Sequence, residues 1–178
     1  MTAMALRISR TRERGADPLA ELHHAHYTSL VRLAALLLGD TGRAEEVVQD
    51  AFVKLHSRIG GLRRSDAAPA YLRSAVLNGA RSQLRHRAVH DRHAERVSTL
   101  GVSPSAEAGA LARTEHDRVL AAMRRLPDRQ REALALRYYL DLSEAEMAAA
   151  MGISTGSVKT HLHRGLAALG DLLEEDDR

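Results

Sequence analysis

The stretch SEAEMAAAMGISTGSVKTHLHRGLAAL, residues 143–169, decides the fold of this chain. Ser143 followed by Glu146 is the pattern of a capping box, which opens a helix. Two methionines at helical spacing give that helix an apolar stripe, and Gly152 stands where a helix would end. Ser154 can then cap a second helix. The stretch therefore predicts two short helices joined by a tight, glycine-containing turn.

The second helix has an apolar side and a polar side. The apolar side is predicted to consist of Val158, Leu162, Leu166 and Leu169. At about 100° per residue, the opposite side carries hydroxyl, imidazole and cationic groups. These positions are Gly156, Thr160, His163 and Arg164, with Ser157 and Lys159 at the edges. Such groups reach base edges and phosphates, and the arrangement is typical of a helix-turn-helix that places its second helix in the DNA major groove.

Every amphipathic helix has a polar side, so this side alone does not indicate DNA binding. Three further features favour it: the capped helix that comes before, the glycine turn, and the lack of any acidic residue between Ser154 and Gly170. We predict that the residues in contact with DNA are Ser157, Lys159, Thr160, His163 and Arg164.

The composition is typical of an all-α protein. The 178 residues suffice for one large domain or two small ones. Leucine and alanine are abundant, whereas the chain has one phenylalanine and no tryptophan. It has no cysteine, which excludes a disulfide framework and a thiolate metal site. The basic opening lacks the apolar core of a signal peptide, and no apolar run approaches a membrane span, so we expect a cytoplasmic protein.

Charge is unevenly distributed, although the net charge is only +3. Arginines stand at positions 63, 64, 73, 81, 85, 87, 92 and 96, where acidic residues are few. Between residues 40 and 50 the balance reverses, because four acidic side chains face a single arginine. A basic block suits phosphate and an acidic helix suits a basic protein surface, while a solvated face is the other interpretation of each block.

A segment of small residues around Pro104 has no periodicity and is the best candidate for a linker. We therefore predict two small helical domains joined by a flexible linker. Their bounds are 17–96 and 114–173, with the linker at 97–113. We expect disorder in the basic extension at 1–16 and in the acidic tail at 174–178.

Helical patterns fill the N-terminal domain. The first pattern ends at Gly39. The second has Asp40 or Thr41 as its cap and ends at Gly60–Gly61. The third meets Asn78–Gly79, a turn-type dipeptide. This dipeptide is either a tolerated weak point of the helix or a break that presents a loop between two helical pieces.

Further helical patterns precede the helix-turn-helix in the C-terminal domain. Thr114 and Asp117 begin a helix that ends at Leu126–Pro127, and Asp128 is the expected cap of the next one. The residues on the apolar side of that next helix are predicted to be Leu134, Leu136 and Tyr138.

These residues together resemble one family. LPDRQREALALRYYLDLSEAEMAAAMGISTGSVKTHLHRGLAAL (126–169) resembles region 4 of the extracytoplasmic-function (ECF) sigma factors, the dissociable promoter-recognition subunits of bacterial RNA polymerase. LVRLAALLLGDTGRAEEVVQDAFVKLH (30–56) resembles their regions 2.1 to 2.2, and AYLRSAVLNGARSQLRHR (70–87) resembles regions 2.3 to 2.4. The resemblance covers nearly everything from residue 17 to residue 173, in the right order.

The resemblance implies a role for each helix. The residues that would dock on the clamp helices of core RNA polymerase are Glu45, Glu46, Val48, Gln49, Asp50 and Phe52. Asn78 would help to hold a flipped base of the −10 element. The residues that would contact the strand beside that base are Tyr71, Arg73, Arg81, Arg85 and Arg87. The positions that match readers of the −35 element are Lys159, Thr160, His163 and Arg164.

The family resemblance also implies partners. The polymerase does the chemistry, so we expect neither a cofactor nor catalysis by this chain. Besides core polymerase and promoter DNA, an anti-sigma factor is an expected partner. Some positions depart from the family pattern and bear on base preference. Tyr71 stands where many relatives have tryptophan, His161 replaces a more basic residue, and glycine rather than a bulkier residue follows Asn78.

Two rival interpretations remain open at this point. An autonomous operator-binding regulator has a similar glycine turn and Val-Lys-Thr helix, but it leaves the acidic helix and the arginine block without a role. A metal site is the second rival, because helical histidines can ligate zinc. The histidines concerned are His86, His90 and His93, and upstream His23, His24 and His26. No carboxylate stands in a supporting position, so solvated or phosphate-facing histidines are preferred.

Overall fold

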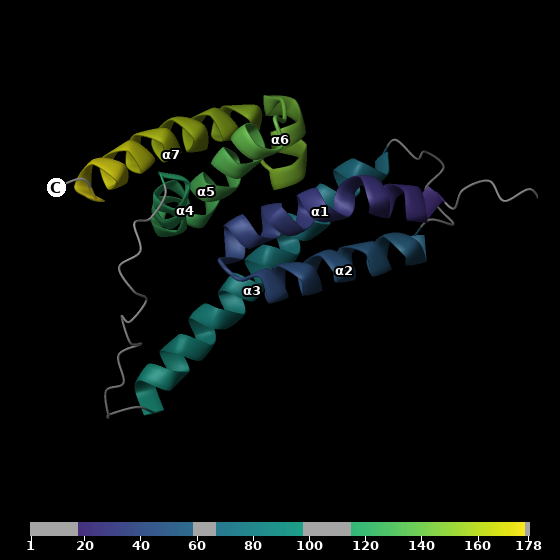
Figure 1. Ribbon diagram of the computed structural model, residues 1–178, viewed down its shortest axis with the longest axis horizontal. Coiled ribbons are helices and arrows are strands. Elements are labelled where there is room, and N and C mark those ends of the chain that lie inside the picture. Colours follow the sequence, from purple (N-terminus) through teal and green to yellow (C-terminus); the bar gives the residue numbers. More distant parts are fainter. Residues whose placement is uncertain (1–17, 59–66, 98–114, 177–178) are drawn as a thin grey trace, which may run out of the picture.

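The computed structural model describes residues 18–58, 67–97 and 115–176, and within these ranges the protein is helical without a strand. The N-terminal unit consists of α1 (Pro18–Leu38), α2 (Thr41–Arg58) and α3 (Ala68–Val97). The C-terminal unit consists of α4 (Glu115–Arg125), α5 (Asp128–Leu134), the π-helical turn η2 (Ala135–Tyr139), α6 (Glu144–Met151) and α7 (Thr155–Asp176) (Figure 1). The all-α prediction is confirmed. Residues 1–16, Gly60–Gly61 and nearly all of the predicted linker lie outside the described residues.

The turn between α1 and α2 forms where the sequence predicts it. Gly39 has a φ of 71°, a left-handed conformation that glycine adopts without strain. Its N–H donates to the carbonyl oxygen of Ala35 at 2.8 Å, which ends α1. Asp40 rather than Thr41 caps α2, because its Oδ1 accepts a hydrogen bond from the backbone N–H of Arg43 at 3.0 Å.

Helix α3 runs without interruption through Asn78–Gly79, so the interpretation of this dipeptide as a loop-forming break is wrong. The glycine instead permits a close approach between helices. A Cβ placed on Gly79 would lie 2.7 Å from Cγ1 of Val47 on α2, closer than packed carbon atoms can come. Gly79 therefore serves the packing of α2 on α3.

The helix-turn-helix has the predicted caps and turn. The Oγ of Ser143 accepts from the N–H of Glu146 at 3.3 Å, and the Oε2 of Glu146 accepts from the N–H of Ser143 at 3.0 Å. Gly152 ends α6 with a φ of 68°. The Oγ of Ser154 accepts from the N–H of Ser157 at 3.1 Å, so Ser154 caps α7.

Two predictions about the helix after Pro127 are wrong. Asp128 does not cap it; Pro127 occupies the cap position, and Asp128 lies in the first turn, where its Oδ1 accepts from Nη2 of Arg131 at 3.2 Å. Tyr138 is 67% exposed rather than on the apolar side. Tyr138 lies within a π-helical turn that covers residues 135–139.

Helix α7 is rotated slightly from the predicted register. Val158 is fully buried, and Leu162 and Leu169 pack against the core, but Leu166 is 46% exposed. Gly165 is buried in its place, with Leu134 and Gln130 so close that an added Cβ would lie 3.2–3.3 Å from their side chains. A periodicity of 3.6 favours position 165 over position 166 as the third contact of the stripe.

The acidic tail is ordered in part, contrary to the expectation. Glu175 and Asp176 belong to the last turn of α7. Their carboxylates lie 3.0 and 3.2 Å from the guanidinium of Arg125 on α4. These exposed ion pairs bring the end of α7 against α4.

The two units pack against each other. Buried residues of both units form one apolar cluster, to which Leu37 of α1 and Leu126 beyond α4 both contribute, and α3 contacts α6. Arg131 joins the units by donating to the carbonyl oxygen of Leu37 at 2.6 Å and to that of Leu126 at 2.9 Å. Burial of this guanidinium lowers its pKa, while the carboxylates of Asp128 and Glu132 act in the opposite direction.

Candidate nucleic-acid interface

The predicted DNA-reading face of α7 lies on the surface. Lys159, Thr160, His163 and Arg164 are exposed, and Ser157 is half-buried. Two of these side chains have partners within the unit: Nζ of Lys159 lies 3.4 Å from Oε2 of Glu144, and Oγ1 of Thr160 donates to the carbonyl oxygen of Gly156 at 3.0 Å. Ser157 is engaged with the cap, since its Oγ lies 2.9 Å from that of Ser154. The imidazole of His163 and the guanidinium of Arg164 face solvent.

The acidic helix α2 separates its predicted polymerase-binding residues into two groups. Glu45, Glu46, Gln49 and Asp50 are exposed. Val48 and Phe52, at 0% and 8% exposure, belong to the core. The ring centroid of Phe52 lies 5.0 Å from that of His23, which stacks on Tyr27 at 4.4 Å.

Sequence reasoning missed Val53, which is 68% exposed on α2. It follows Glu46, Gln49 and Asp50 at helical spacing and therefore shares their face. Its exposure could have been predicted, because Val53 lies outside the apolar stripe of α2 that contains Val48 and Phe52. A large apolar side chain within an acidic face is a usual feature of a protein-binding surface.

The predicted strand-capturing residues of α3 also divide into two groups. Asn78, Arg85 and Arg87 are exposed. Arg73 and Arg81 are largely covered, with side chains 20% and 14% exposed, because they face the C-terminal unit. Tyr71 is partly buried and packs against the core.

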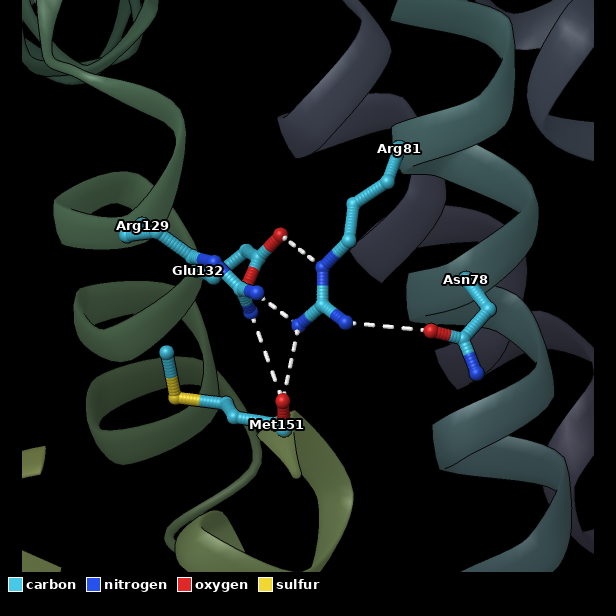
Figure 2. Close-up of polar contacts among 5 residues, drawn as sticks. All are labelled: Asn78, Arg81, Arg129, Glu132 and Met151. Atoms are coloured by element: carbon cyan, nitrogen blue, oxygen red, sulfur yellow. Dashed lines mark hydrogen bonds and ion pairs between the residues drawn. The ribbon is translucent and has the colours of Figure 1, made fainter. Parts of the chain in front are cut away.

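Arg81 is bound by the C-terminal unit (Figure 2). Its Nε and Nη2 donate to Oε1 and Oε2 of Glu132 at 2.7 and 2.6 Å, and its Nη1 donates to Oδ1 of Asn78 at 3.0 Å. Nη1 of Arg129 reaches the same glutamate at 3.2 Å. Both arginines also donate to the carbonyl oxygen of Met151, at 3.4 and 3.3 Å.

Arg73 has a weaker contact of the same kind. Its Nη2 lies 3.7 Å from Oε1 of Glu146, the carboxylate that closes the capping box of α6. No pattern in the sequence connects the carboxylates of Glu146 and Glu132 with the arginines of α3. Glu132 is the one acidic residue among the buried positions of α5, and this pattern does not identify its partner.

The histidines form no convincing metal site. Within the described residues, no group of three or more histidine, cysteine, aspartate or glutamate side chains could hold a metal ion. His23 packs on aromatic rings, as described above, and the side chains of His90 and His93 lie outside the described residues. Among the described helices, none is long and apolar enough to cross a membrane.

Family models match both units. The model for sigma-70 region 2 matches residues 22–89, and the model for sigma-70 region 4 matches residues 116–169.

Curated relatives match over most of their length. An RNA polymerase sigma-E factor of Streptomyces avermitilis is 34% identical over 151 residues, which cover 84% of this chain and 81% of the relative. The ECF RNA polymerase sigma factor EcfG of Rhodopseudomonas palustris is 31% identical over 162 residues, which cover 90% of this chain and 87% of the relative.

Solved structures share the fold. The sigma factor RpoE of Bartonella quintana, in complex with the anti-sigma factor NepR, matches with a TM-score of 0.71 and 24% identity over 89% of this chain and 98% of that chain. CnrH in complex with the cytosolic domain of CnrY matches with a TM-score of 0.64 and 23% identity over 89% of this chain and 88% of that chain. The family models match regions 2 and 4, and the two curated sigma factors are 34% and 31% identical to this chain. The chain therefore belongs to the ECF family of RNA polymerase sigma factors.

Proposed function

We propose that this sigma factor divides promoter recognition between its two units. The N-terminal domain, residues 17–96, docks on core RNA polymerase and captures the −10 strand. The C-terminal domain, residues 114–173, reads the duplex −35 element. The observation that carries this proposal is the presence of an acidic surface on α2, a row of arginines with Asn78 on α3, and a cationic reading face on α7, all in one chain.

The exposed face of α7 suits a duplex. Arg164 and His163 offer donors for base edges, and Lys159 offers a point charge for phosphate. The N-terminal end of α7 adds the partial positive charge of the helix dipole. Release of counterions from DNA makes this binding sensitive to salt.

The face of α2 that carries Glu46, Gln49, Asp50 and Val53 suits a basic protein surface with an apolar centre. Val48 and Phe52 support this face from within the core. We assign polymerase docking to the exposed residues of this helix.

Asn78 and the arginines of α3 suit a single strand. An extruded base loses its stacking, at a cost of a few kcal/mol, and hydrogen bonds to the base offset that cost. Capture of the unpaired strand shifts the duplex towards melting without covalent chemistry. The chain therefore acts as a regulatory subunit rather than as an enzyme, and it needs no cofactor.

We also propose an anti-sigma factor as partner and the cytoplasm as location, where an anti-sigma factor can hold the protein near the membrane. The support is that solved structures of the same fold contain anti-sigma factors.

The test of this proposal is in vitro transcription with core polymerase on a genomic DNA library. We expect this chain to direct initiation at a limited set of promoters with a shared two-part sequence. A gel shift separates the rival function, because an autonomous regulator binds its site alone, whereas this chain should require core polymerase.

Two variants assign the surfaces. Arg164→Ala should lower promoter binding and leave polymerase association unchanged. Asp50→Arg should lower polymerase association instead. If Asp50→Arg bound core polymerase as well as the wild type does, the docking surface would have to lie elsewhere.

A further inference from the structure

We propose that Glu132 of the C-terminal unit occupies the α3 arginine that would otherwise contact promoter DNA, so that the chain alone is held in a closed arrangement unable to capture the −10 strand. The inference rests on the proposed role of α3 in strand capture. It concerns a contact within the chain and requires no anti-sigma factor.

The contact between Arg81 and Glu132 has the geometry of an arginine bound to phosphate. Two parallel N–H groups, on Nε and Nη2, donate to the two carboxylate oxygens at 2.7 and 2.6 Å (Figure 2). Arginine binds phosphate oxygens with the same two-donor geometry. The carboxylate therefore takes the place of a backbone phosphate at Arg81.

Burial makes the two uses of Arg81 mutually exclusive. Its side chain is 14% exposed, and that of Glu132 is 3% exposed. A nucleic-acid strand has no access to the two engaged nitrogens while α5 lies against α3. If Arg81 turned away with α5 still in place, Glu132 would remain a buried charge without its two-donor partner, which is unfavourable even with Arg129 nearby. Release of Arg81 therefore requires the units to separate.

The same contact restrains Asn78. Its Oδ1 accepts from Nη1 of Arg81 at 3.0 Å, so the guanidinium bound to Glu132 also fixes the orientation of the amide. Arg73 is restrained nearby, 3.7 Å from Glu146 of α6. Three of the residues assigned to strand capture, Arg73, Asn78 and Arg81, are therefore restrained, whereas Arg85 and Arg87 stay exposed.

The closed arrangement leaves the other surfaces accessible. Glu46, Asp50 and Val53 on α2 are exposed, as are His163 and Arg164 on α7. Polymerase can thus engage α2 before the units separate. Strand capture follows separation.

Glu132→Gln tests the proposal because it removes the charge while keeping the side-chain size. The chain has no cysteine, so spin labels on His56→Cys and Ala167→Cys, both at exposed positions, report the distance between the units. We expect a single distance in the doubly labelled wild-type protein and an added second distance in Glu132→Gln, with about a tenfold gain in the open fraction. Glu174→Gln is the matched control: it removes one exposed carboxylate from α7 and should leave the distance unchanged.

Binding of a fluorescein-labelled, single-stranded oligonucleotide of mixed sequence gives the second readout. Glu132→Gln should bind it about tenfold more tightly than the wild type, since apparent affinity rises with the competent fraction. The double variant Arg81→Gln/Glu132→Gln should open equally and lose this gain. Unchanged distances together with unchanged affinity in Glu132→Gln would overturn the proposal.

The wild-type protein provides a check that does not depend on a buried substitution. Adding the oligonucleotide to the spin-labelled wild-type protein should populate the second distance. Binding without any change of distance would contradict the inference even if Glu132→Gln failed to fold. Transcription with core polymerase separates this result from the proposed function: a chain that initiates normally but never changes its interdomain distance retains the function and loses the inference.

Discussion

Gly79 and Asn78 are neighbours with unrelated roles. The sequence presents them as one turn-type dipeptide, yet Gly79 faces Val47 on α2 and Asn78 faces outwards towards Arg81. A dipeptide signal reports backbone preference only. It does not report that another helix, here α2 with Val47, packs where a Cβ would otherwise lie. The role of Gly79 in a continuous helix therefore could not be predicted from the dipeptide.

Gly79→Ala should destabilise the protein. The new methyl group would lie 2.7 Å from Cγ1 of Val47, and we expect a loss of about 1–3 kcal/mol in the free energy of unfolding because α2 must shift. Denaturant unfolding measures it. Gly170→Ala is the control, since no atom lies within 4 Å of its added Cβ, and it should be neutral or stabilising by about 0.5–1 kcal/mol.

A second substitution makes the steric argument specific. Adding Val47→Ala to Gly79→Ala removes the opposing methyl group and should recover part of the lost stability. If Gly79→Ala alone matched the wild type, close packing of α2 on α3 would not be the reason for this glycine.

Glu146 adds a pH dependence to the helix-turn-helix. Hydrogen bonds from the backbone N–H and then from the hydroxyl of Ser143 hold the pKa of Glu146 below its ordinary value of 4.5. Its contribution to stability is therefore fully present above pH 4.5 and is lost as the pH falls through the lower pKa of the folded state. Glu146→Gln keeps hydrogen-bonding capacity without titrating, so its unfolding free energy should fall less with acid. Identical acid profiles for both proteins would assign the effect to other carboxylates.

At the scale of the element, the predictions that were confirmed are those that depend on residues close together in the sequence. The capping box, the glycine ends of α1 and α6, and the serine cap of α7 each depend on residues within four positions of one another. The details that failed depend on partners elsewhere. Leu134 and Gln130 of α5 lie close against Gly165 rather than Leu166, and Tyr138 lies in a π-helical turn that no residue pattern predicts.

Adjacent residues of α2 should give opposite results on substitution. Phe52→Ala removes a buried ring and should cost about 3–5 kcal/mol of unfolding free energy. Val53→Asp changes an exposed side chain, so stability should stay within about 0.5 kcal/mol, while binding to core polymerase weakens. Thermal unfolding and a polymerase pull-down distinguish them. A stable Val53→Asp variant with full polymerase binding would remove Val53 from the docking face.

At the scale of the whole molecule, the arrangement of the two units could not be predicted from the sequence. Arg81 and Glu132 are 51 positions apart, and the predicted linker lies between them. A row of arginines indicates a phosphate-binding surface, but an acid that competes for one of them has no local signature. The sequence therefore supports the prediction of a phosphate-binding surface on α3 and contains no sign that Arg73 and Arg81 are covered.

Arg131 should couple the unfolding of the two units. It is buried and donates to carbonyl oxygens of Leu37 and Leu126, one on each side of the interface. Arg131→Met leaves these oxygens without their donor, at about 1–3 kcal/mol for each buried group. Calorimetry should show one transition for the wild type and a broadened or divided transition at lower temperature for the variant. A single unshifted transition would mean that the units are coupled by apolar contacts alone.

Helix α3 has a consequence for the order in which DNA is engaged. Its 30 residues make a rod about 45 Å long, of which the C-terminal part projects away from the other helices (Figure 1). Arg85, nearer the projecting C-terminal part (the arm), is exposed. Arg73 and Arg81, in the N-terminal part of the helix (the root), are covered by the C-terminal unit. A strand can therefore be met first by the arm and only afterwards by the root. Because the rod is continuous, a strand held on the arm already lies along the helix that carries the covered arginines when the units separate.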